Sequence, residues 1–251
     1  MTIERKNRAT PKGEFDMAFT YIFKRVEKKY MLTQEQYEYI LSRLEPHMHE
    51  DRFGRTVIRN IYFDNKADEL IETSLTKPAY KEKLRLRSYG TPDGDSTVFF
   101  EIKKKYQGVV YKRRIAMTRD DAYRYILTGE LPADLVGNIP VEIDYMIRRY
   151  RLFPKAFISY RRLALVGNND PELRITFDSE ITSRYDDVRL ESDAEGEQLL
   201  PEGCHLMEIK IPGALPLWLA HILSEKSIYP HSYSKFGTAH MMRRERQLRA
   251  S

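Results

Sequence analysis

Short segments of the chain alternate apolar with polar residues, which is the period-two pattern of β-strands. In residues 83–87, Lys83, Arg85 and Arg87 alternate with two leucines. The same alternation of polar, mostly charged, residues with apolar residues recurs in six other segments. Their polar positions are Glu27 and Lys29, Glu101 and Lys103, Lys112 and Arg114, Tyr160 and Arg162, Arg174 and Asp178, and Glu208 and Lys210. We therefore predict seven amphipathic strands whose polar faces carry mostly charged residues.

Helix signals lie between these strands. The sequence Thr33-Gln34-Glu35-Gln36 is a capping box, which predicts a helix from there to about Leu44. A Thr118 cap and a Gly129 stop bound another helix over 119–127. Further helices are expected over 67–75, 140–149, 216–223 and 235–248.

The charged strand faces allow two interpretations. Each face by itself suits the solvated side of an ordinary antiparallel sheet. The repeated combination of Lys or Arg with Glu or Asp on these faces favours a second arrangement, in which the strands close into a barrel with the charged faces inward. The helices would then cover an apolar exterior, and carboxylates would have to pair with some of the enclosed cations.

Length and composition indicate an ordinary globular protein. The chain has 251 residues, of which 41% are hydrophobic and 31% charged, and no long linker divides it. We expect a flexible basic tail over 1–14 and a single domain over 15–251. Because the chain has neither a long apolar run nor a secretory signal, we expect a cytoplasmic location. The single cysteine, Cys204, excludes an intrachain disulfide.

The positive charge is concentrated in one stretch. The whole chain has a formal net charge of +5, whereas residues 81–114 alone contain ten Lys or Arg and four acidic residues. Such a focused potential predicts an anionic partner, which could be nucleic acid, acidic lipid headgroups or phosphates.

A cationic tunnel suits a triphosphate or polyphosphate, because Lys and Arg on alternate positions place point charges along a line. Carboxylates in the same tunnel could bind Mg²⁺ or Mn²⁺, which prefer oxygen ligands and bridge phosphates. Glu208 is the preferred ligand and Glu27 the next, although each also suits a salt bridge. Tyr160 suits a phosphate contact, a nucleobase contact or packing. No GxxxxGK[ST] loop, GxGxxG turn or HExxH motif is present.

The strand motifs together resemble a known family. In chain order they are Ile-Tyr-Phe-Asp-Asn at 61–65, Lys-Leu-Arg-Leu-Arg-Ser-Tyr-Gly at 83–90, Phe-Glu-Ile-Lys-Lys at 100–104, Tyr-Lys-Arg-Arg at 111–114, Ser-Tyr-Arg-Arg-Leu-Ala at 159–164, Leu-Arg-Ile-Thr-Phe-Asp at 173–178, Met-Glu-Ile-Lys at 207–210 and Tyr-Ser-Lys-Phe at 233–236. Their order resembles the VTC-type polyphosphate polymerase domain, one of the triphosphate tunnel metalloenzymes of the CYTH-like superfamily.

The resemblance implies an α+β fold with an eight-stranded antiparallel β-barrel tunnel and flanking helices. It implies an ATP-dependent polyphosphate polymerase, in which a divalent metal assists transfer of the γ-phosphate of ATP to a growing chain. Carried over residue by residue, the metal carboxylate would be Glu208 and the phosphate-binding cations Lys29, Arg85, Arg87, Lys103, Lys112, Arg162, Arg174 and Lys235.

We assign roles within this set. Arg85, Arg87, Arg162, Arg174 and Glu208 are the expected catalytic residues, and Tyr160 and Lys210 join the lysines as expected phosphate contacts. Glu27 joins Glu208 as an expected metal ligand for Mn²⁺ or Mg²⁺.

Two other functions remain open. A hydrolase of the same fold would cleave inorganic triphosphate or a nucleoside triphosphate with water as the acceptor. A module without enzymatic activity would only bind polyanions. The expected partners are ATP and polyphosphate rather than nucleic acid, with no transmembrane segment in the chain, and a membrane partner protein is possible. The sequence does not give the oligomeric state.

Overall fold

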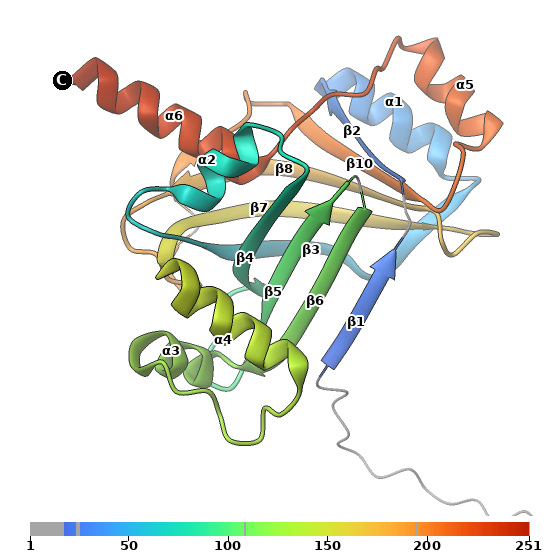
Figure 1. Ribbon diagram of the computed structural model, residues 1–251. Helices are drawn as coiled ribbons and strands as arrows, with labels where there is room; N and C mark the ends of the chain where they lie inside the picture. The colour runs from blue at the N-terminus through green and yellow to red at the C-terminus, as the bar shows by residue number, and fades with distance from the viewer. Residues whose placement is uncertain (1–17, 24–25, 108, 194, 251) are drawn as a thin grey trace, which may run out of the picture.

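Figure 1 presents a computed structural model of the chain, of which residues 18–23, 26–107, 109–193 and 195–250 are described here. The described residues form ten strands and six helices. The strands are β1 (Ala18–Phe23), β2 (Val26–Leu32), β3 (Met48–Asp64), β4 (Tyr80–Tyr89), β5 (Thr97–Tyr106), β6 (Val109–Thr118), β7 (Phe153–Gly167), β8 (Arg174–Arg184), β9 (Glu197–Gln198) and β10 (His205–Ile211). The helices are α1 (Gln34–Leu44), α2 (Glu69–Leu75), α3 (Arg119–Thr128), α4 (Asn138–Tyr150), α5 (Leu217–Glu225) and α6 (Lys235–Ala250).

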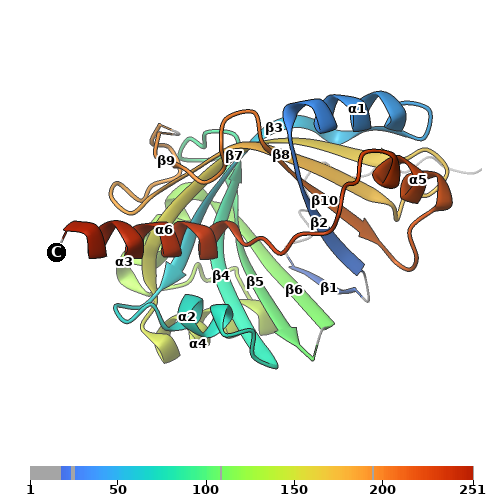
Figure 2. The same cartoon turned by 90° about the horizontal axis from the view of Figure 1, so that it is seen from above.

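One antiparallel sheet curves around a central space, as the view in Figure 2 shows. Its strand order is β1-β6-β5-β4-β3-β7-β8-β10-β2, and β9 pairs with β8. The two ends of this path, β1 and β2, pair with β6 and β10 respectively and not with each other in the described residues. The α+β tunnel architecture is therefore confirmed. It differs from the expected eight-stranded barrel in having two additional strands and in not being closed by backbone hydrogen bonds among the described residues.

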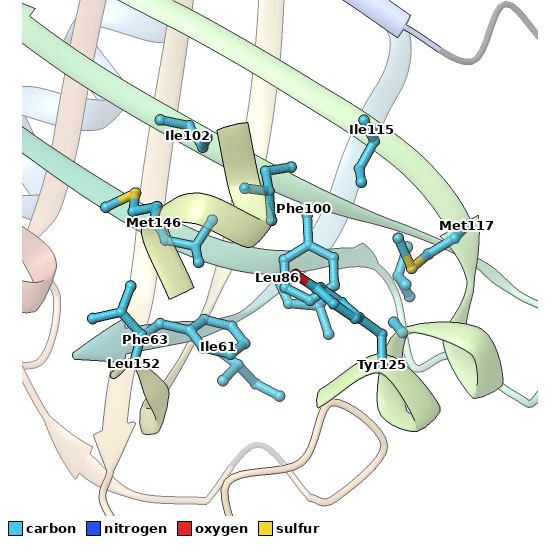
Figure 3. Packing of buried hydrophobic residues seen from close by; sticks show 14 of the residues in the cluster. Ile61, Phe63, Leu86, Phe100, Ile102, Ile115, Met117, Tyr125, Met146 and Leu152 are labelled. Atoms are coloured by element: carbon cyan, nitrogen blue, oxygen red, sulfur yellow. The ribbon is translucent and has the colours of Figure 1, made fainter. Parts of the chain in front are cut away.

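The apolar faces of β4, β5, β6, β8 and β10 point outward, and helices cover them. A further buried cluster, with Ile58 of β3, Ile158 of β7 and Phe236 of α6, lies instead on the inner face of the sheet. On one side, Leu84, Leu86 and Phe100 of the sheet pack in one cluster with Tyr125 of α3 and Met146 of α4 (Figure 3). The rings of Phe100 and Tyr125 meet edge to face with their centroids 5.8 Å apart. Burial of these side chains stabilises the fold by about 1.5–3 kcal/mol for each large residue.

A second apolar cluster lies on the same outer face, at the other side of the central space. Ile175, Met207 and Ile209 of β8 and β10 are buried against α1 and α5, which contribute Leu44 and Leu219 among others. The polar faces of the same strands consequently point away from the helices and toward the central space, because side chains alternate along a strand.

The local signals place the helices as expected. The Thr33 side chain accepts a hydrogen bond from the Gln36 amide, and the Gln36 side chain accepts one from the Thr33 amide, so the capping box is formed. Gly129 ends α3 with a φ of 74°, a left-handed conformation that glycine adopts without strain.

Two predictions about chain organisation stay predictions. The basic tail over 1–14 lies outside the described residues, and the single domain over 15–251 is not tested. Among the described residues, no helix combines the length and apolar character needed to cross a membrane.

Candidate functional site

The charged faces of distant strands meet around the central space. Glu27 of β2 and Lys103 of β5 form an ion pair of 3.6 Å, although five strands separate β2 from β5 along the sheet. At the start of α6, Ser234 accepts a hydrogen bond from Lys83 of β4, and the Tyr233 carbonyl accepts one from Lys29 of β2. The charged faces therefore converge as predicted, although the sheet around them is not closed by pairing of β1 with β2 in the described residues, and we call the space between these faces the tunnel.

Glu101 of β5 is the centre of a tight cluster of ion pairs. Its side chain is 1% exposed and lies 2.6 Å from Arg85, 2.7 Å from Lys112 and 3.7 Å from Arg87. Burial by itself would raise the pKa of Glu101, but the three cations hold that pKa well below its usual value. The buried carboxylate therefore stays charged and fixes the two arginines in place.

Asp178 of β8 is the centre of a second tight cluster. It is fully buried and accepts two hydrogen bonds from Arg162, at 2.6 and 2.7 Å, and one from Lys235 at 2.6 Å. Against the effect of burial, the charges of Arg162 and Lys235 lower the pKa of Asp178. This bidentate contact with Asp178 orients the Arg162 guanidinium.

Glu208 of β10 has looser surroundings. Its oxygens lie 3.5 Å from Lys29, 3.5 Å from Lys210 and 3.7 Å from Lys235. Glu27 is similar, with ion pairs of 3.6 Å to Lys29 and Lys103. Burial opposes ionisation of Glu208, but its lysine neighbours keep its pKa well below the usual value. Both carboxylates are thus charged without a cation in close contact.

Two lysines of the tunnel have strongly lowered pKa values. Burial, with Arg87 and Arg85 nearby, lowers the pKa of Lys112 to about 7, although Glu101 opposes the change. Burial likewise lowers the pKa of Lys83 to about 8. These amines are partly neutral near pH 7 to 8, and an incoming anion would favour their protonated forms.

Tyr160 is part of the tunnel wall. It is 2% exposed, and its hydroxyl accepts a hydrogen bond of 3.1 Å from Arg87. The Lys235 ammonium lies 4.5 Å from the centre of its ring. Tyr160 therefore positions cations that face the tunnel, and the packing interpretation of this residue agrees with its burial.

The structure brings most of the expected site residues into one network, and Arg174 lies at its margin. Arg174 begins β8, is exposed and is in register with Lys210 of β10. Among the described residues, no ion pair joins Arg174 to the carboxylates of the tunnel. The residues that the network does gather are Glu27, Lys29, Arg85, Arg87, Lys103, Lys112, Tyr160, Arg162, Glu208, Lys210 and Lys235.

The sequence assignments omitted several residues that the structure places in this network. Glu101 and Asp178, the two tight counter-ions, were placed on the correct faces but given no role in the site. Tyr62 and Asn60 of β3 hydrogen-bond to Arg85 and Arg87 respectively, at 3.2 and 2.9 Å. Asn60 and Tyr62 are two residues apart, so the sequence places them on one face of a strand. A strand face with one amide and one hydroxyl is also typical of a face exposed to solvent, and it does not by itself indicate a site.

The carboxylates do not form a complete metal site by themselves. The described residues contain no group of three or more His, Cys, Asp or Glu side chains that could hold a metal ion. A metal at Glu208 and Glu27 would therefore need further oxygen ligands. Phosphate oxygens of a substrate and water commonly complete the coordination of Mg²⁺ in this way.

Comparison with known proteins identifies the family of the chain and structures of similar fold. A family model described as the VTC domain matches residues 24–242. A structure from Bacillus halodurans, described as a candidate adenylate cyclase, is 15% identical with a TM-score of 0.52, and the match covers 84% of this chain and 93% of that chain. A candidate adenylyl cyclase from Hippeastrum, described as having a dominant triphosphatase activity, is 15% identical with a TM-score of 0.43, covering 84% and 93%. No curated protein matches. At such identities, the Bacillus structure shows a common fold only.

Proposed function

Since the chain belongs to the VTC domain family, we propose that it is an ATP-dependent polyphosphate polymerase. It transfers the γ-phosphate of ATP to the end of a polyphosphate chain inside the tunnel. The observation that carries this proposal is the gathering of cations from four strands around the tunnel: Lys29 of β2, Arg85 and Arg87 of β4, Lys103 of β5 and Arg162 of β7. A polyanion with charges repeated along its length is the ligand that such an array of cations fits best.

The arginines supply positioned positive charge. Glu101 holds Arg85 and Arg87, and Asp178 holds Arg162, so their guanidinium groups need little reorganisation when phosphate binds. Catalysis of phosphoryl transfer depends largely on such positioning and on stabilisation of charge in the transition state. The attacking oxygen of the chain end is already anionic, and it forms a bond to the γ-phosphorus while the bond to the β-phosphate oxygen breaks and ADP leaves. No general base is required.

The proposal includes Mn²⁺ or Mg²⁺, and the donor set fits such an ion. Glu208 and Glu27 present charged oxygens whose nearest cations are 3.5 Å or more away, so a metal can approach these oxygens without displacing a close contact. When bound, the metal would neutralise phosphate charge. Lys29, Lys210 and Lys235, which surround Glu208, would bind phosphate oxygens of the substrate.

Product analysis tests the proposal. Incubation of the purified protein with ATP and Mn²⁺ should give ADP and long-chain polyphosphate, which gel electrophoresis and ³¹P NMR detect. Orthophosphate without chain growth would refute the polymerase and favour the hydrolase. Salt-sensitive binding of polyphosphate without turnover of ATP would favour a polyanion-binding module instead.

A further inference from the structure

An exposed aromatic cluster lies at one end of the tunnel. Phe53 of β3 and Tyr89 of β4 stack with their ring centroids 5.4 Å apart and nearly parallel, and the Phe99 ring of β5 meets Tyr89 edge to face at 5.9 Å. Phe53 and Tyr89 are 47% and 36% exposed. Large aromatic rings held in contact with one another and with solvent form a surface on which another ring can stack.

Two arginines complete this cluster. The Arg52 guanidinium lies 4.6 Å from the centre of the Phe53 ring, and the Arg114 guanidinium lies 4.5 Å from that of Phe99. Aromatic rings combined with guanidinium planes are the side chains that hold unpaired nucleobases in proteins that bind single strands.

The cluster continues the phosphate-binding face. Tyr89 is two residues beyond Arg87 and four beyond Arg85 on β4, so the three side chains share one face of the strand. Phe99 is likewise two residues before Glu101 and in register with Arg87. With a rise of about 3.3 Å per residue, Tyr89 and Arg85 are separated by about 13 Å along the strand. This separation is comparable with the reach of an extended nucleoside triphosphate from its γ-phosphate to its base.

We propose that the surface formed by Phe53, Tyr89 and Phe99 binds the base of the nucleotide substrate. This inference rests on the proposed function and adds the orientation of the nucleotide and of the polyphosphate chain in the tunnel. The nucleotide lies with its base at the Tyr89 end of β4 and its phosphates on Arg87 and Arg85. The polyphosphate chain then extends toward the other end of these strands, where Lys81 and Lys105 pair in register.

Calorimetric binding of ATP and of inorganic tripolyphosphate, both without divalent metal, tests the assignment. Tyr89→Ser and Phe53→Ser should each weaken ATP binding about tenfold, which is within the usual contribution of base stacking, and leave tripolyphosphate binding within twofold of the unchanged protein. Tyr106→Ser is the matched control, because Tyr106 is a 50% exposed aromatic residue at the opposite end of β5, and it should change neither affinity.

The outcomes separate this inference from the proposed function. Unchanged ATP affinity in both variants, or equal weakening of ATP and tripolyphosphate, would overturn the base-binding surface even if polyphosphate is made. If the variants lose ATP affinity selectively but the protein makes no polyphosphate, the surface stands and the polymerase is refuted.

Discussion

The two sides of the tunnel hold their carboxylates differently. On the β4-β5-β6 side, Glu101 contacts Arg85 and Lys112 at 2.6 to 2.7 Å. On the β2-β10 side, the lysines of the described residues that lie nearest to Glu208 are 3.5 Å away. Both carboxylates are buried and have lowered pKa values, because cations around them outweigh burial.

This difference separates two roles that residue type alone does not distinguish. A buried carboxylate in close contact with arginines acts as their fixed counter-ion, and its loss leaves uncompensated charge in the protein interior. A carboxylate surrounded by cations at longer range keeps its oxygens available for a metal. We therefore expect substitutions on the two sides to affect different properties.

The largest effect is expected for the arginines of the tight side. Arg85→Ala and Arg87→Ala should each lower turnover of ATP by about a hundredfold or more, since each removes a positioned charge from the transferring phosphate. Steady-state kinetics with Mn²⁺ measures the loss.

Arg161→Ala is the control for these variants. Arg161 is adjacent to Arg162 in sequence, but its side chain is 68% exposed and pairs with the exposed Glu180. It should retain turnover within about twofold, because exposed ion pairs contribute little. Similar losses in Arg161→Ala and Arg85→Ala would contradict the tunnel assignment.

The two glutamates offer the sharpest contrast. Glu101→Gln should lower the free energy of unfolding at pH 7 by about 3–5 kcal/mol, because Arg85, Arg87 and Lys112 lose their buried counter-ion. Glu208→Gln should destabilise the fold less but abolish metal-dependent turnover while polyphosphate still binds. Urea unfolding, kinetics and binding of polyphosphate measure the three properties. Retained turnover in Glu208→Gln would refute the metal assignment.

The stability contributed by Glu101 has a defined pH dependence. Its folded pKa lies well below the ordinary value of 4.5, so the contribution is present above about pH 4.5 and is lost as the pH falls through the folded pKa. The stability difference between the unchanged protein and Glu101→Gln should narrow accordingly in acid. A difference that is constant from pH 7 to pH 3 would show that Glu101 is not the stabilising charge.

The smallest expected effect is the proton uptake that accompanies the binding of tripolyphosphate. At pH 8 the amine of Lys112, with a pKa of about 7, is mostly neutral, and a bound polyanion would raise that pKa. Tripolyphosphate binding should therefore be accompanied by uptake of close to one proton from the buffer onto Lys112, and affinity should fall as the pH rises above 7. Calorimetry in buffers of different ionisation enthalpy measures the uptake.

Lys112→Met should remove most of this proton uptake. Lys104→Met is the control, because Lys104 points outward from β5 to Glu142 of α4 and should leave the uptake unchanged. Equal uptake in all three proteins would contradict the assignment to Lys112.

Much of the fold was predictable from local signals. The capping box at Thr33 and the Gly129 stop placed α1 and α3, because caps act through hydrogen bonds within a few residues. Alternation also placed Arg85, Arg87 and Lys103 on the polar faces of their strands. The strands β1, β3 and β9 are not among the seven that alternation predicted. For β1 and β9 the reason is that a short strand without strong alternation depends on its partner for its conformation.

The sequence by itself determined which side chains share a face of each strand, because alternation follows from backbone geometry within that strand. Only the tertiary structure decided that those faces enclose a tunnel, that Glu101 and Asp178 hold the arginines closely, and that Glu208 does not hold its lysines. These distances depend on the curvature and register of strands far apart in the chain, and residue order does not specify the spacing of charges across an enclosed space.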